Sequence, residues 1–461
     1  MIQSAWGWLE AKRVMALPAG SLRARATRGT FWSIAGAGVS QGLALGVSMI
    51  VARVLGREGF GELGMVTSTV GMFGVFAGLR LGTTATKYVA ELRVTDPGRA
   101  GRILSLSLWT AALAGAASAV LFLAAAPALS RSVLNAPYLA SALRLGCALL
   151  FVSTIDGAQT GALAGFEAFR AIARVSVIRA LATVPIMVAA VSLQGVNGAV
   201  GGMAVAASIG LWLNHRALRR ECRAAGIATS RRGIADERPV LWRFSLPAFL
   251  AAAMVGPITW VGNTLLVNQP NGYAEMGLLN AAAQWRTALA FVPSVLASVA
   301  LPMLSNLYGR QSLEGYRKVF WTNVALVCAI AVGAGVPIIV ASGLIMSAYG
   351  AEFADGGPVL ATMAVAAALS CSLAVVGTAI ASMGRMWHGF VLNCVWAAAF
   401  IWSAAVFTRH GAIGLALAYA VSYAVHLVSV GAYTVLAMDI VLPRRLRRNR
   451  QRNGPDVASD V

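Results

Sequence analysis

The sequence predicts an all-α, polytopic integral membrane protein with about twelve transmembrane helices in two six-helix lobes. Its 461 residues are 58% hydrophobic and only 12% charged, and the mean hydropathy is +0.72. A soluble domain of this length would need more charge to cover its surface. The apolar residues also occur in runs of about 20, a length that crosses a hydrocarbon core of about 30 Å.

Twelve apolar runs follow one another along the chain and predict twelve spans. They cover residues 31–52, 60–84, 103–126, 138–163, 175–193, 198–214, 243–268, 274–300, 320–345, 357–382, 389–408 and 412–437. The segment 1–30 before them is basic and lacks a continuous apolar core. It is therefore expected to be a cytoplasmic tail and not a cleaved signal peptide.

The positive charges predict how these spans are oriented. One set of alternate gaps, including both tails, holds 30 Lys and Arg residues, and the other set holds 5. Because Lys and Arg stay on the cytoplasmic side, both termini are expected in the cytoplasm. The net charge of +20 is thus explained by topology and does not indicate nucleic-acid binding.

Two glycine motifs predict an internal repeat. Residues 59–64 read GFGELG, and residues 272–277 read GYAEMG, 213 positions later. The first copy matches G-x-G-x-x-G, but a long apolar run precedes it and no acid follows at the required distance, so a dinucleotide site is excluded. The motifs GAVG at 198–201 and GAIG at 411–414 have the same displacement. We therefore expect lobes at 31–214 and 242–437, joined by a basic cytoplasmic linker at 215–241 and followed by a basic cytoplasmic tail at 438–461.

The cysteines, histidines and glycines lead to three further, more limited predictions. The five cysteines form no C-x-x-C pair and the four histidines are scattered, so no disulfide, metal or other cofactor is expected. Gly74, Gly78 and Gly82 are spaced by four in the second span. Small residues at this spacing predict close helix packing.

Ionisable residues inside the predicted spans are the candidate functional residues, because charge at mid-bilayer is costly. Arg286 lies 11 residues after Glu275, about 16 Å along a helix and on the same face. Asn280 and Gln284 form a polar stripe beside it. This face of the eighth span is expected to line a cavity or to pair internally.

The second span has a related pattern. Glu62 and Arg80 are 18 residues apart, which is five helical turns, so they share a face. Asp156 lies in the inner half of the fourth span and is an alternative ion-pair partner for Arg80, while Arg53 ends the first span. Glu62 and Glu275 occupy equivalent places in the two halves, where they either couple to an ion or cap the outer ends of their helices.

The first span ends in ARVLG at 52–56, and an aromatic-Gly pair follows at Phe60-Gly61. This pattern resembles the start of oligosaccharide flippases of the multidrug/oligosaccharidyl-lipid/polysaccharide exporter superfamily. LAGFEAFRAIARVSVIRA (163–180) and MGRMWHGFVLN (383–393) are similar to the turns before the fifth and eleventh spans of these proteins. The resemblance covers about residues 31–437 and implies a two-lobed fold like that of multidrug exporters of this superfamily.

The resemblance also implies a function. Such proteins export a polyprenyl-diphosphate-linked oligosaccharide across the inner membrane by alternating access, for surface polysaccharide such as O-antigen, capsule or exopolysaccharide. Lipid II flippases place a cationic pocket in their first, second and eighth helices, and this sequence has arginines in those helices. Arg286, Arg80 and Arg53 are therefore the expected diphosphate contacts, since a guanidinium suits phosphate oxygens.

Three other functions are open to this sequence. A multidrug or toxin cation antiporter of the same superfamily would favour acids deep in the lobes, whereas the deepest ionisable residue is Arg286. A membrane enzyme would need acids or a metal site on sizeable loops, and the outer gaps are short. A structural scaffold is the third. Proton or sodium coupling, and a polysaccharide polymerase or ligase partner, are compatible with the flippase and are not encoded in any motif.

Overall fold

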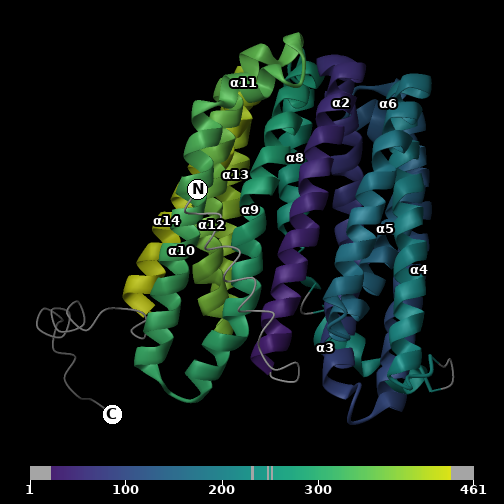
Figure 1. Cartoon of the computed structure of the whole chain (residues 1–461). Coiled ribbons are helices and arrows are strands. Elements are labelled where there is room, and N and C mark those ends of the chain that lie inside the picture. The colour runs from purple at the N-terminus through teal and green to yellow at the C-terminus, as the bar shows by residue number, and fades with distance from the viewer. Residues whose placement is uncertain (1–21, 230–232, 247–248, 251–252, 438–461) are drawn as a thin grey trace, which may run out of the picture. The chain divides into compact units, whose positions relative to one another are not determined.

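All described elements of the chain are helices or turns. A computed structural model describes residues 22–229, 233–246, 249–250 and 253–437 (Figure 1). Residues 1–21 and 438–461, which make up most of the two predicted tails, lie outside the described residues. The main helices are α2 (Leu22–Gly78), α3 (Leu81–Leu92), α4 (Pro97–Ala128), α5 (Ala140–Gly165), α6 (Phe169–Ala224), α8 (Val255–Val267), α9 (Gly272–Gly309), α10 (Leu313–Val340), α11 (Ser342–Ser347), α12 (Gly357–Ser382), α13 (Met386–Phe407) and α14 (Gly411–Ala437).

Each of the twelve predicted spans overlaps one of these helices. By length and composition, seven stretches of the described residues could cross a membrane, and α8 is a shorter apolar helix. In two of the seven stretches, a backbone break divides one element into two helical segments. Gly56 interrupts α2 with φ 70° and ψ 178°, and Gln194–Gly195 interrupt α6. Each break falls in a gap between two predicted spans, so α2 and α6 each supply two of them.

The described chain divides into two compact units. Unit 1 comprises the described residues up to Ala281 together with Ser347–Ala354, and unit 2 comprises Ala282–Met346 together with the described residues from Asp355 onwards. The division falls inside α9. The limits of the two lobes and of the linker stay predictions.

Unit 1 is organised around α5, which packs against α2, α3, α4 and α6. Figure 1 shows α2, α4, α5 and α6 running side by side. One buried cluster joins four helices through small and aliphatic side chains: Val89 of α3, Leu104 of α4, Leu163 of α5 and Leu218 of α6 are among its members. Burial of such side chains is the main stabilising term of this end of the unit.

The predicted linker 215–241 is part of unit 1. Its first ten residues continue α6 to Ala224, and Ile227 is buried among α3, α4 and α5 side chains. Glu237 is buried and accepts from Arg99 at 3.2 Å and from Arg102 at 3.3 Å. Two arginines on one buried carboxylate fasten the linker to the start of α4.

Unit 2 has α12 between α10 and α14, with α13 packed on α14. Its largest cluster includes Leu304 of α9, Phe320 and Tyr316 of α10 and Val375 of α12. The buried Tyr316 hydroxyl lies 2.8 Å from the Ser382 hydroxyl, which satisfies a polar group that would otherwise be costly to bury.

The two copies of the glycine motif pack against each other within unit 1. A Cβ atom added at Gly61 would lie 1.8 Å from the Tyr273 carbonyl oxygen, and one at Gly277 would lie 2.0 Å from the Arg57 carbonyl oxygen. Only glycine permits such a close approach of two helix backbones. The motif that resembles a nucleotide-binding turn is therefore the crossing point of α2 and α9.

Candidate functional site

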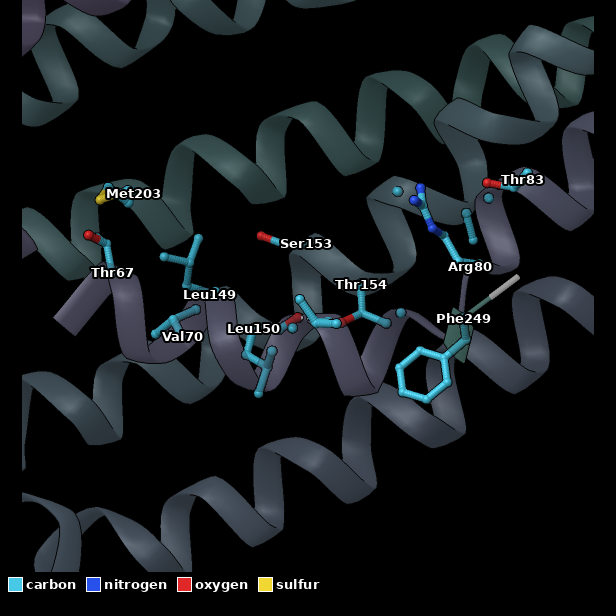
Figure 2. A pocket seen from close by; sticks show the side chains of 17 residues that line it. Thr67, Val70, Arg80, Thr83, Leu149, Leu150, Ser153, Thr154, Met203 and Phe249 are labelled. Carbon is cyan, nitrogen blue, oxygen red and sulfur yellow. Dashed lines mark hydrogen bonds between the residues drawn. The ribbon is translucent and has the colours of Figure 1, made fainter. Parts of the chain in front are cut away.

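A cavity of about 670 Å³ lies inside unit 1, between the second half of α2 and the middle of α5 (Figure 2). The junction between α2 and α3 forms one end of it, and Met203 of α6 and Phe249 complete the wall. Most of the wall is apolar or glycine. The polar side chains on it are Thr67, Arg80, Thr83, Ser153 and Thr154.

Arg80 reaches the cavity because the backbone turns sharply before it. Leu79 and Arg80 both have positive φ, 41° and 54°, between the last residue of α2 and the first of α3. Left-handed backbone at a residue with a side chain costs about 1–2 kcal/mol. Such strain is concentrated at functional positions, where the surrounding structure maintains it. Here it ends α2 and places the guanidinium at the cavity end.

The Arg80 guanidinium has no acidic neighbour on the wall. Within the described part of the chain, Arg80 is the one charged residue that lines the cavity. Its side chain makes no hydrogen bond or ion pair with any described residue. The start of α3 next to it also lacks a side-chain cap, so its first amide groups carry partial positive charge toward the same end.

Asp156, the predicted alternative partner of Arg80, is engaged elsewhere. Its buried carboxylate accepts from Arg179 at 3.1 Å and from Asn214 at 2.7 Å, both on α6. Asn214 also donates to Thr160 at 3.1 Å. The structure thus pairs Asp156 with Arg179 and not with Arg80, because Asp156 lies on the face of α5 that contacts α6.

The spacing of the glycines predicts close helix packing, but several glycines at the cavity have open space beside them. A Cβ atom added at Gly71, Gly78 or Gly157 would meet nothing within 4 Å. One added at Gly82 would lie 2.7 Å from the Gly157 carbonyl oxygen, so the packing prediction is correct there. At Gly78 it is wrong, because this stretch of α2 faces open space instead of another helix.

A second cation lies on the exposed side of α3. Lys87 is seven residues after Arg80, in the second turn of α3. Its ammonium lies 4.7 Å from the Tyr88 ring centroid and 4.5 Å from that of Phe244. Sequence reasoning did not single out Lys87, although its spacing from Arg80 was a usable signal.

Arg53 and Glu275 belong to a network around the break in α2. Arg53 Nε donates to the Ala348 carbonyl at 2.9 Å. Arg57 forms an ion pair with Glu275 at 2.6 Å, and its backbone N–H donates to Glu352 Oε2 at 2.8 Å. The network fixes the segment 347–354 to α2. Arg57 was missed at the sequence level because its partners are more than 200 positions away.

Glu62 and Asn280 lie near the α2–α9 crossing. The half-buried Glu62 carboxylate is hydrogen-bonded to the Tyr138 hydroxyl. Asn280 donates to the Phe60 carbonyl at 3.2 Å, and its side chain fills the space beside Gly64. Asn280 therefore stabilises the helix crossing, and it is not on the wall of the cavity.

Arg286 and Gln284 lie in unit 2. The Arg286 guanidinium carbon is 5.3 Å from the centroid of the Tyr419 ring on α14, and its Nε is buried with no hydrogen-bond partner among the described residues. Gln284 is half-buried on the same helix. Arg286 is thus a half-buried cation beside an aromatic ring, with a buried Nε–H that no described residue uses.

No group of three or more His, Cys, Asp or Glu residues that could hold a metal is found among the described residues. The polar groups of the described cavity wall are hydroxyls, which donate or accept, and one guanidinium, which only donates.

A sequence model described as polysaccharide biosynthesis protein matches residues 26–308, well over half of the chain. The chain belongs to this polysaccharide biosynthesis protein family. The EPS I polysaccharide export inner membrane protein EpsE of Ralstonia nicotianae is 24% identical over 392 residues, which cover 83% of this chain and 88% of that protein.

Solved structures confirm the fold of this family member. An inward-facing multidrug resistance MATE family transporter of the MOP superfamily matches with a TM-score of 0.71 at 15% identity, over 90% of this chain and 99% of that one. The lipid II flippase MurJ, in an inward closed conformation, matches with a TM-score of 0.69 at 14% identity, over 94% of both chains. The expected resemblance to this superfamily is thus confirmed: the chain belongs to the polysaccharide biosynthesis protein family and has the fold of these transporters.

Proposed function

We propose that this polysaccharide biosynthesis protein flips a polyprenyl-diphosphate-linked oligosaccharide across a bacterial inner membrane by alternating access. The observation that carries the proposal is the unpaired guanidinium of Arg80 at the end of a cavity with no acid on its described wall. Such a substrate joins an anionic diphosphate to a hydroxyl-rich glycan, and the cavity joins one cationic end to an uncharged body.

The cation at Arg80 favours an anionic ligand. The Arg80 guanidinium is exposed and has no counter-charge on the described wall, and its planar fork matches phosphate oxygens. The adjacent uncapped start of α3 adds two favourable features, a partial positive charge and free amide groups. Thr83 on the first turn contributes a hydroxyl to the same end.

A multidrug or toxin cation antiporter is disfavoured by the same wall. An organic cation needs a carboxylate or an aromatic surface to replace its hydration. The described cavity wall offers Phe249 but no Asp or Glu, and it offers Arg80, which would repel the cation. The buried Asp156 is already neutralised by Arg179.

Arg286 in unit 2 is the proposed second anion contact, because its Nε is buried and unsatisfied. Arg53 is a weaker candidate, since it already donates to a backbone carbonyl. Glu62 is the proposed coupling residue: it has the Tyr138 hydroxyl as its partner, whereas Glu275 is bound by Arg57. A proton or sodium ion at Glu62, or the membrane potential acting on the anionic substrate, would supply the driving force.

The proposed topology has both termini in the cytoplasm and lobes at 31–214 and 242–437, following the excess of Lys and Arg in alternate gaps. The inner-membrane location is supported by the Ralstonia relative, which is an inner membrane protein. The expected partners are the lipid-linked oligosaccharide, membrane lipids and a polysaccharide polymerase or ligase that acts on the exported unit.

Deletion and complementation in the native host test the proposal. Deletion should abolish surface glycan and cause polyprenyl-linked oligosaccharide to accumulate in the inner leaflet. Complementation with Arg80→Gln should give about tenfold to a hundredfold less export than wild type, since hydrogen bonds to a charged group contribute about 1.5–3 kcal/mol. Arg80→Lys should restore part of it.

Arg93→Gln is the matched control, because Arg93 pairs with Glu167 at an exposed site away from the cavity wall and should retain wild-type export. Normal surface glycan in the deletion strain, together with new sensitivity to cationic dyes, would overturn the flippase and favour the cation antiporter.

A further inference from the structure

The cavity has a long uncharged part beyond Arg80. From Thr67 to Gly78 its wall follows 11 residues of α2, about 16 Å at the helical rise per residue. In Figure 2, Arg80, Thr83 and Phe249 lie at one end, and Thr67 and Met203 lie at the other. A diphosphate bound at Arg80 would occupy only one end of this space.

Glycines occupy several places on the wall of the cavity. Gly71, Gly74 and Gly78 belong to α2, and Gly157 belongs to α5. Glycine is unfavourable in a helix interior compared with alanine, so it normally reflects a close contact or a special backbone conformation. Neither applies at Gly71 or Gly78, where the backbone is helical and an added Cβ would meet nothing within 4 Å. At Gly157 an added Cβ would also meet nothing, although its carbonyl oxygen lies close to Gly82.

Ser153 adds a polar group to this part of the wall. It lies one turn before Gly157 on α5, it is exposed, and its hydroxyl has no hydrogen-bond partner among the described residues. Thr67 and Thr154, by contrast, donate to carbonyls of their own helices. The Ser153 hydroxyl is therefore free to bond a neutral, hydroxyl-rich ligand.

We infer that Gly71, Gly78 and Gly157 set the size of the glycan that the protein accepts, by keeping open the space in which the sugars next to the diphosphate lie. This inference rests on the proposed function and deepens it. The cavity is the site, and the glycines are its specificity-determining residues. They act by leaving out side-chain volume. Added volume at Gly71, nine residues before Arg80, should exclude the glycan and leave the phosphate end unaltered. Gly78 and Gly157 lie nearer that end, because Gly78 precedes the Leu79–Arg80 turn and the Gly157 carbonyl lies close to Gly82.

Binding measured with two probes tests the inference. The full-length protein in lipid nanodiscs is titrated with undecaprenyl diphosphate alone and with the lipid-linked oligosaccharide that accumulates in the deletion strain. We compare wild type, Gly71→Ala and Gly71→Leu. The leucine variant should bind the glycan-bearing lipid about tenfold or more weakly, the alanine variant should be intermediate, and undecaprenyl diphosphate should bind each with unchanged affinity.

Gly201→Leu is the matched control, because Gly201 on α6 also has open space around its Cβ position but does not line the cavity. It should bind both probes like wild type. No variant should unfold at a lower temperature than wild type, since no added Cβ meets a neighbour and a helical glycine is replaced by a better helix former.

Each outcome has a distinct meaning. A Gly71→Leu variant that binds and transports the glycan-bearing lipid normally would overturn the inference and leave the proposed function intact. Equal weakening of both probes would also overturn it, because the added side chain would then act on the phosphate end. Wild-type protein that binds neither probe would overturn the proposed function and the inference together.

Discussion

The two ends of the second span of this protein use strained backbone in opposite ways. At the first end, Gly56 breaks α2 with a backbone conformation that suits glycine, and Arg57 beside it is bound by Glu275 and Glu352. At the other end, Leu79 and Arg80 adopt positive φ without being glycine, and the Arg80 side chain has no described partner. The break at Gly56 is stabilised by an ion pair and a hydrogen bond within the protein. The turn at Leu79–Arg80 instead leaves a cation available to a ligand.

The presence or absence of a bonding partner thus distinguishes a structural arginine, such as Arg57, from a functional one, such as Arg80. A paired arginine contributes to stability, and its loss leaves a carboxylate unpaired. An unpaired arginine contributes little to stability, and its loss affects ligand binding. Substitutions at the Gly56 end should therefore lower the free energy of unfolding. Substitutions at the Arg80 end should lower transport and change the free energy of unfolding little.

The largest expected effect on stability is at Gly56. Gly56→Ala places a Cβ in a region of φ and ψ that is essentially restricted to glycine, 3.2 Å from Glu352 Oε2. We expect a loss of roughly 2–3 kcal/mol in the free energy of unfolding. Thermal unfolding followed by tryptophan fluorescence would measure it, with Gly201→Ala as a helical control. An unchanged melting temperature would show that the break does not require glycine.

Arg57→Met should have the next largest effect. The ion pair with Glu275 is partly exposed, with 19% and 25% of the two side chains accessible, so the loss should be about 1–2 kcal/mol and not the value of a fully buried pair. Arg53→Met is the comparison, because Arg53 makes one exposed bond to a carbonyl and should cost less. Equal destabilisation by both substitutions would contradict the central role of Arg57.

Leu79→Gly should have the smallest effect on stability and the opposite sign. Glycine removes the cost of the left-handed conformation and raises the entropy of the unfolded chain, which leaves a net gain of roughly 0.5 kcal/mol. Transport should fall, because Arg80 is then held less firmly at the cavity end. A variant that is more stable and equally active would show that the strain does not position Arg80.

Much of the fold could be predicted from the sequence because its signals are local. The apolar runs predict the helices, and the gaps at Gly56 and Gly195 fall where the backbone breaks. Charge inside an apolar run is also a local property, which is why Arg80 and Arg286 stand out from the sequence alone. The repeat of the glycine motif likewise needs nothing beyond spacing.

Only the tertiary structure decided which of these residues have partners. Asp156 bonds Arg179 instead of Arg80, and Glu275 bonds Arg57, because helix packing determines which faces meet. Gly61 and Gly277 prove to be a helix crossing, while Gly78, with the same helical spacing signal as Gly82, faces a cavity. A sequence specifies which side chains a helix carries along its length. Whether each one has a charged partner or open space beside it depends on neighbours that folding brings from distant positions.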